Sequence, residues 1–235
     1  MTPKQIVPGI YVIALGGVNA FLLEVEDGLI LIDTGMPGSA SKILAGVRSL
    51  GKQPGDIRHI LVTHCHFDHI GTLAELKEAT GAPAYMHPAD AALLRAGQTM
   101  RSFEAGPGLV NGLIYRLFKL FLKSTAITPI PIEREVQDGE ELPLAGGLRV
   151  IHVPGHTAGQ LAFLWPYQGG VLFAADTANT VLGLGWHFVY EDLAEAKLSL
   201  AKLAQLDFEV ACFGHGGAIV GGAAQRFRQK WGKLS

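Results

Sequence analysis

Cysteine is scarce in this chain, and its two copies, Cys65 and Cys212, are too few for a disulfide framework. Neither sign of charge is in large excess. The formal net charge is -2 and no long run of either sign occurs, which argues against a nucleic-acid partner. No run of about 18 uncharged apolar residues exists, so we expect no membrane span. The first residues also lack the apolar segment of a signal peptide. Together these absences predict a cytoplasmic location.

Apolar residues are abundant: they make up 49% of the 235 positions and predict a sizeable buried core. The first half of the chain alternates strand and helix signals. Strands are expected at 10–14, 19–26, 29–33, 58–63 and 83–87, with Asp27-Gly28 as a hairpin turn, and helices at about 39–50, 73–80 and 88–95. This order predicts a sheet with parallel parts and helices outside it.

An amphipathic segment at 109–123 interrupts that rhythm before the second half begins. Strands are then expected at 134–136, 148–153, 161–165, 171–175 and 209–213, and helices at about 193–206 and 218–231. We therefore predict a single α/β domain over residues 1–235, with a helical insertion at about 88–130. Its architecture would be an αββα sandwich, in which two mixed β-sheets pack face to face with helices on both outer faces.

A dense group of metal-ligand side chains follows the strand predicted at 58–63. His64, His66, Asp68 and His69 fall within six residues, and imidazole and carboxylate are the ligands of zinc and similar metals. Positions 64, 66 and 68 alternate, which suits an extended loop that points them one way, whereas His69 must point elsewhere. Two adjacent metals could share this set more easily than one. The alternative is a histidine-rich surface loop without a metal.

Three further ligand candidates each lie just past a predicted apolar strand. They are His156 in a glycine-flanked turn, Asp176, and His215 between glycines. Strand ends gather at one edge of a sheet, where α/β enzymes place their sites. A lone histidine after a strand is more often an ordinary edge residue, but the arrangement recurs, which favours a shared site.

The pattern His64-x-His66-x-Asp68-His69, followed by His156, Asp176 and His215, resembles the metallo-β-lactamase fold superfamily over nearly the whole chain. By that resemblance, His64, His66 and His156 hold one metal, Asp68, His69 and His215 hold a second, and Asp176 bridges them. The resemblance implies a bridging hydroxide that attacks the substrate, and Asp68 as a residue that orients it or carries a proton. It also implies that Asp33 fixes a ligand histidine. Zinc is the expected metal, with iron or manganese as alternatives.

The implied function is a metal-dependent hydrolase that cleaves an ester-like, lactone or related bond in a small molecule. Acyl-homoserine lactonases are the nearest functional analogy, and they place an oxyanion-donating tyrosine where this chain has Asn179. Tyr190, from a later loop, could take that role. The alternatives are a mononuclear-iron sulfur dioxygenase and a glyoxalase II-like thioesterase, although the further C-terminal region of glyoxalase II is not found here. A non-catalytic binding protein is the alternative from another class.

Two expectations concern residues outside this ligand set. The apolar arc of the 109–123 helix is wide enough that it must be buried. The alternatives are a lid over the cleft that a homodimer could share, packing in the core, and association with a membrane surface. His59, His87, His152 and His187 match no ligand position, although the loop at 179–190 that contains His187 could line the substrate cleft.

Overall fold

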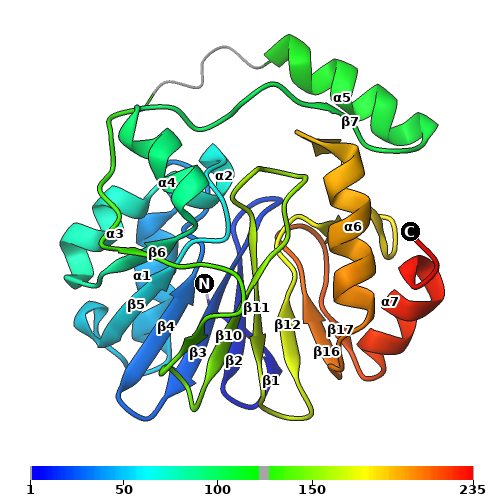
Figure 1. Cartoon of the computed structure of the whole chain (residues 1–235). Helices are drawn as coiled ribbons and strands as arrows, with labels where there is room; N and C mark the ends of the chain where they lie inside the picture. Colours follow the sequence, from blue (N-terminus) through cyan, green and yellow to red (C-terminus); the bar gives the residue numbers. More distant parts are fainter. Residues whose placement is uncertain (1, 122–126, 235) are drawn as a thin grey trace.

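The computed structural model describes residues 2–121 and 127–234 and shows two β-sheets packed face to face between helices (Figure 1). The first sheet has the order β1-β2-β3-β4-β5-β6-β8. Its strands are β1 (Lys4–Val7), β2 (Ile10–Ala14), β3 (Asn19–Val25), β4 (Gly28–Ile32), β5 (Ile57–Leu61), β6 (Ala84–Met86) and β8 (Arg134–Glu135). Pairing is antiparallel from β1 to β4 and parallel from β4 to β8. The predicted parallel part is therefore confirmed.

The second sheet comes from the other half of the chain and has the order β17-β16-β12-β11-β10-β9. Its strands are β9 (Glu141–Leu142), β10 (Leu148–His152), β11 (Leu161–Trp165), β12 (Val171–Phe173), β16 (Val210–Cys212) and β17 (Ile219–Val220). Only the β12–β16 pair is parallel, so this sheet is mixed as well. Two short ribbons lie outside the sheets: β7 (Glu104–Ala105) pairs with β15 (Val189–Tyr190), and β13 (Ala178–Asn179) pairs with β14 (Gly185–Trp186).

Helices cover the outer face of each sheet. The first sheet is flanked by α1 (Ala40–Ser49), α3 (Leu73–Thr80) and α4 (Pro88–Arg95), and the second by α6 (Leu193–Ala204) and α7 (Ala223–Trp231) (Figure 1). Three apolar clusters fill the layers. One joins α1 and α3 to the first sheet, one lies between the sheets around Phe163 and Phe173, and one joins α6 and α7 to the second sheet. The predicted αββα sandwich is confirmed; the assignment of 1–235 to a single domain stays a prediction.

Two local predictions were wrong. The segment after His66 is not extended, because a short helix, α2 (Phe67–Ile70), begins there and carries Asp68 and His69. The helical turn, rather than strand-like alternation, therefore sets the directions of these two side chains. The last helix begins at Ala223 rather than at 218, because residues 219–220 pair with β16 as β17. Gly221 and Gly222, both with left-handed backbone angles, separate this strand from the helix.

The predicted insertion helix is α5 (Leu109–Phe121), and the predicted positions 122 and 123 lie outside the described residues. Figure 1 shows it above the end of the sandwich at which α2 lies. Burial in the core is wrong for much of its apolar arc, because Leu109 is 95% exposed and Val110, Leu113 and Leu117 are at least half exposed. None of the helices in the described part of the chain has the length and apolar content that a bilayer crossing needs.

Candidate metal centre

The site forms where four strands end at one edge of the sandwich. The segment after β5 carries Thr63 and the histidine cluster, and His156, Asp176 and His215 lie just past β10, β12 and β16. The bend at Asp33, directly after β4, has a left-handed backbone (φ 60°), and its carboxylate accepts hydrogen bonds from the Thr63 N–H and hydroxyl at 2.8 Å each. These bonds fix the start of the loop that carries the histidine cluster.

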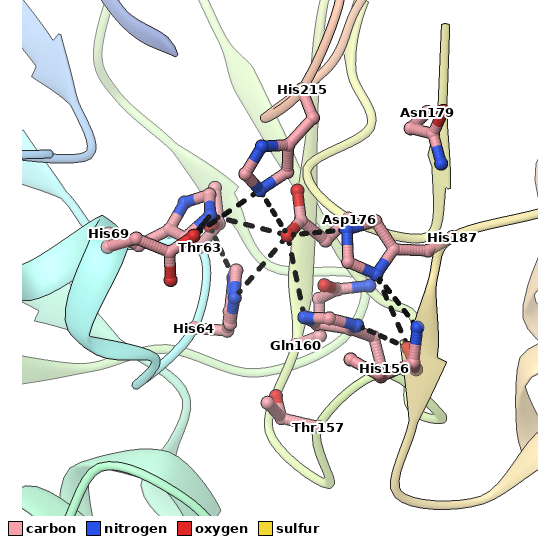
Figure 2. A network of polar contacts seen from close by, with 12 residues as sticks. Thr63, His64, His69, His156, Thr157, Gln160, Asp176, Asn179, His187 and His215 are labelled. Carbon is pink, nitrogen blue, oxygen red and sulfur yellow. Dashed lines mark hydrogen bonds and ion pairs between the residues drawn. The ribbon is translucent and has the colours of Figure 1, made fainter. Parts of the chain in front are cut away.

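The Asp176 carboxylate lies at the centre of the site (Figure 2). Its Oδ2 atom is 3.1 Å from the Nε2 atom of His215 and 3.3 Å from that of His69. The corresponding distances are 3.5 Å for His156 and 3.9 Å for His64. His187, which was not among the predicted ligands, places its Nε2 atom 3.2 Å from the same oxygen. Five imidazoles thus point one nitrogen each toward a single carboxylate oxygen.

The remaining two predicted ligands lie at either side of this centre. The ligand atom of His66 is within 4.8 Å of those of His64 and His156, and Asp68 Oδ2 is 3.4 Å from His215 Nε2. The structure therefore brings together all seven residues predicted as ligands: His64, His66, Asp68, His69, His156, Asp176 and His215. Glycine is required beside them, because a Cβ atom on Gly214 would lie 2.0 Å from Asp176 Oδ1.

Hydrogen bonds on the far side of the rings orient the histidines. Nδ1 of His69 lies 2.8 Å from Asp33 Oδ2, which gives Asp33 the orienting contact that the resemblance implied. Nδ1 of His64 meets the Thr63 hydroxyl, that of His156 meets the Val189 carbonyl, and that of His215 meets the Gly17 carbonyl, at 2.7–3.0 Å. Such bonds favour a proton on Nδ1 and turn the Nε2 atom into the site, which is the orientation of metal-bound histidine.

Burial and neighbouring charges shift the pKa values of the histidines in opposite directions at different positions of the site. Burial, reinforced by neighbouring imidazoles, lowers the pKa of His64 and His66 well below the usual value, so both are neutral at pH 7. Burial alone would also lower the pKa of His215, but the Asp176 carboxylate raises it to about 10. His69 is raised in the same way, against burial, by Asp176 and Asp33. The carboxylates beside these two rings therefore favour their protonated forms, whereas burial disfavours them in His64 and His66.

The donor set fits divalent metal ions. Nε2 of His64, His66, His69 and His156, and Oδ1 of Asp176, are buried and have no hydrogen-bond partner among the described residues. Leaving so many buried polar atoms unpaired is costly unless something else binds them. Groups of three such atoms lie within 4.8 Å of one another, a spacing that suits ligands of one ion. Nitrogen and carboxylate oxygen are ligands of zinc, and suit iron and manganese as well.

A cavity of about 200 Å³ opens directly on this centre. Its polar lining comes from the metal-ligand candidates and His187, whereas its apolar walls are Phe67, Met100, Ile114, Phe188 and Val189. Met100 and Ile114 belong to the predicted insertion, and Phe188 and Val189 belong to the loop that was expected to line the cleft. The insertion thus forms part of the wall over the site.

The buried carboxylate of Asp90, on α4, ties two ligand-bearing loops together from behind. It accepts hydrogen bonds from Cys65 N at 3.1 Å, the Thr157 hydroxyl at 2.7 Å and Gly159 N at 3.1 Å, and it pairs with Arg101 at 3.0 Å. Cys65 lies between two ligand candidates and Thr157 follows a third, so one side chain fixes the backbone on both sides of the centre. No sequence pattern indicates this role, because a single aspartate on a short helix is usually solvated.

The two predicted oxyanion donors do not line the cavity. The Asn179 amide lies apart from the Asp176 cluster (Figure 2), where it donates to the Trp186 carbonyl at 2.9 Å and accepts from Val181 N at 3.1 Å. The buried Tyr190 hydroxyl donates to the Thr177 carbonyl at 3.0 Å and accepts from His187 N at 2.6 Å. Both groups thus hold the loop in this structure, and a catalytic role for either stays a prediction.

Comparisons with known proteins agree with this geometry. A family model described as the metallo-beta-lactamase superfamily matches residues 13–215. The uncharacterized protein YobT of Bacillus subtilis (strain 168) is 30% identical over 232 residues, which cover 92% of this chain and 90% of YobT. The probable metallo-hydrolase YflN of the same organism is 27% identical, with coverage of 91% and 86%. A solved metallo-beta-lactamase from Cronobacter sakazakii is similar with a TM-score of 0.71 at 25% identity, covering 92% of this chain and 81% of that one.

Proposed function

The chain is an enzyme of the metallo-beta-lactamase superfamily, and from that premise we propose that it is a hydrolase that uses two divalent metal ions to cleave an ester-like, lactone or related bond in a small molecule. The observation that carries this proposal is the Asp176 oxygen with five imidazole nitrogens turned toward it, four of them without a hydrogen-bond partner among the described residues. When bound, two such ions supply a water nucleophile at neutral pH and stabilise developing negative charge on oxygen.

The protein's own groups assist the reaction in which water adds to the acyl carbon and the bond to the leaving oxygen breaks. Asp68 is placed for proton transfer, because it lines the cavity and its side chain is 21% exposed. Burial opposes its ionisation, but His69 and His215 hold the pKa of the Asp68 carboxyl well below its usual range. Ionised Asp68 would accept a proton from the water and return it to the leaving alkoxide.

The cavity indicates the substrate class. A volume of about 200 Å³ is below the range of about 300–1,000 Å³ that is common for drug-sized ligands, so it suits a compact molecule. Its apolar walls face the polar floor, an arrangement that places an acyl or aromatic group against Phe67 and Phe188 and the reacting bond over the metals. A lactone or a small ester has this division between an apolar body and a polar bond.

Zinc is the proposed metal, because a set dominated by imidazole with carboxylate suits it. The two cysteines are buried and unpaired, which fits the proposed cytoplasmic location. Asn179 and Tyr190 are proposed as residues that hold the cavity loop, unless substrate binding frees one of them as an oxyanion donor.

Metal analysis combined with a hydrolysis screen tests the proposal. We expect about two metal ions per chain and hydrolysis of some member of a panel of esters, thioesters and lactones, with loss of activity on chelation and recovery when metal is returned. His66→Ala should lose metal and activity. His59→Ala is the matched control, because His59 bonds to Tyr85 away from the cavity. A protein with about one iron that consumes oxygen would instead support the sulfur dioxygenase alternative.

A homodimer through α5 is proposed as the reason for its exposed apolar side chains. Leu109, Val110, Leu113 and Leu117 lie together on one helix, and Val110 shares a surface hollow with the 78% exposed Leu182. Apolar patches of this kind usually mark an interaction surface.

Sedimentation analysis of Leu113→Asp tests this interface. We expect a dimer for the wild type and a monomer for the variant, with metal content unchanged. Leu198→Asp, on α6 and 54% exposed, is the matched control and should stay dimeric. A wild-type monomer at all concentrations would refute the interface, and binding of that monomer to lipid vesicles would favour the membrane-surface alternative.

A further inference from the structure

His187 enters the site from a loop to which the family pattern assigns no ligand. It precedes β15, and its side chain is 6% exposed and lines the cavity. Its Nε2 atom is 3.2 Å from Asp176 Oδ2, closer than the Nε2 atoms of His64, His69 and His156. That Nε2 atom also has no hydrogen-bond partner among the described residues, as is true of the predicted ligands around it.

One carbonyl oxygen orients both His187 and its neighbour His156. Val189 O lies 2.9 Å from His156 Nδ1 and 3.3 Å from His187 Nδ1. A carbonyl oxygen only accepts hydrogen bonds, so it favours the Nδ1–H tautomer in His156. In His187 the carbonyl is the shorter of two contacts and favours the same tautomer, while the Val189 N–H lies 3.5 Å from the same Nδ1 atom. The two Nε2 lone pairs are then directed into the site, and the rings meet edge to face with centroids 4.3 Å apart. The ring of His187 is therefore oriented like that of the predicted ligand His156.

We propose that His187 is an eighth ligand of the metal centre, binding through Nε2 to the ion that His156 holds. The proposal rests on the proposed function only in that it needs the centre to bind metal. The ligand atoms of His156, Asp176 and His187 lie within 4.8 Å of one another, a span that a single ion can bridge. Zinc and related ions accept a fifth ligand, so His187 adds to the family set rather than replacing a member of it.

The insertion positions this ligand. The Asn111 side chain of α5 donates to the His187 carbonyl at 3.2 Å, and Gly106 N donates to the Phe188 carbonyl at 2.8 Å. The ribbon between β7 and β15 continues this contact. Gly106 leaves no room for a side chain, because a Cβ atom there would lie 2.0 Å from the His187 carbonyl oxygen. The helical insertion thus helps to determine how a metal ligand is placed.

Cobalt-substituted protein gives a readout that is independent of turnover. Co²⁺ replaces zinc, and its visible absorption reports the number and type of ligands. We expect His187→Ala to change the spectrum of one of the two ions and to weaken its retention against a chelator by at least about tenfold, since even outer contacts to metal ligands cost about 10- to 100-fold. His59→Ala should match the wild type in both measurements.

A second variant covers the case in which His187→Ala does not fold. Asn111→Ala keeps His187 but removes the side chain that holds its carbonyl, so we expect a smaller change of the same spectral band. An unchanged spectrum and unchanged retention in folded His187→Ala would overturn the proposal, even if activity fell. A wild type that takes up no cobalt would overturn both this proposal and the proposed function. Two bound ions without hydrolysis of any tested substrate would contradict the proposed function but not the assignment of His187 as a ligand.

Discussion

Replacement of Asp90 by alanine should destabilise the protein strongly, because this fully buried carboxylate satisfies four donors at once. The donors are the N–H groups of Cys65 and Gly159, the Thr157 hydroxyl and the Arg101 guanidinium. In Asp90→Ala the two buried N–H groups lose their partner, and Arg101 loses one of its carboxylates.

The magnitude follows from how much of this network the variant retains. Removing one partner of a buried ion pair costs about 3–5 kcal/mol. The lower half of that range applies to the pair itself, because the Arg101 side chain is 32% exposed and keeps Glu191 at 3.3 Å. Each buried donor left unpaired adds about 1–3 kcal/mol unless water reaches it. We therefore expect a loss of at least about 3–4 kcal/mol, the share of the ion pair alone, or about 6–16 °C in melting temperature for a chain of this size.

Urea-induced unfolding of the metal-free protein, followed by tryptophan fluorescence, measures this loss without a contribution from metal binding. Asp138→Ala is the matched control, because Asp138 pairs with Lys202 at 2.8 Å but its side chain is 53% exposed. Surface pairs of this kind contribute about 0–1 kcal/mol. Asp90→Asn should fall between the two, since the amide still accepts hydrogen bonds but carries no charge.

The result that refutes this reasoning is a loss of less than about 1 kcal/mol for Asp90→Ala, equal to that of the control. A related outcome concerns the metal. Because Asp90 holds the backbone beside His64, His66 and His156, Asp90→Ala should also bind metal about 10- to 100-fold more weakly, as other outer-contact variants do. Unchanged metal affinity would show that the ligand loops keep their shape without it.

The remaining predictions concern the centre itself. Asp176→Ala should weaken both metal sites, and two ions that stay tightly bound in the variant would rule out a bridging role. Asp68→Asn should keep metal but lower turnover by about 100- to 10,000-fold, as for other acid–base residues, and unchanged turnover of a substrate with a poor leaving group would count against that role. Asp176 raises the pKa of His215 to about 10 and that of His69 well above its usual value, in each case against the effect of burial. These shifts favour a second ring proton at pH 7, and a metal ion must displace it to bind. The affinity for metal at this half of the centre should therefore rise with pH toward about 10. Calorimetry in two buffers of different ionisation enthalpy measures the protons released, and a release of none at pH 7 would contradict the prediction.

Local patterns were enough to predict the sandwich and the seven ligand candidates that the structure brings together. Alternating apolar residues mark strands such as β5, and glycines beside His156 and His215 mark the turns at their ends. Ligand residues that follow several strands in one chain converge once those strands share an edge. The alternation of the ligand candidates at 64, 66 and 68 predicted an extended loop, and this was wrong because the helical turn α2 begins at Phe67. Alternation in sequence does not report backbone angles.

The positions of His187 and Asp90 could not be read from the sequence and became visible in the packing of the folded chain. His187 reaches the centre because β15 pairs with β7 of the insertion, and no local pattern records a contact between segments so distant in sequence. Asp90 on its short helix looks like a solvated carboxylate until packing places Cys65, Thr157 and Arg101 around it. The same holds for α5, whose apolar arc predicted burial although packing left Leu109 and Leu113 in solvent. Periodicity shows that a face is apolar, whereas what covers that face depends on where the fold places its neighbours.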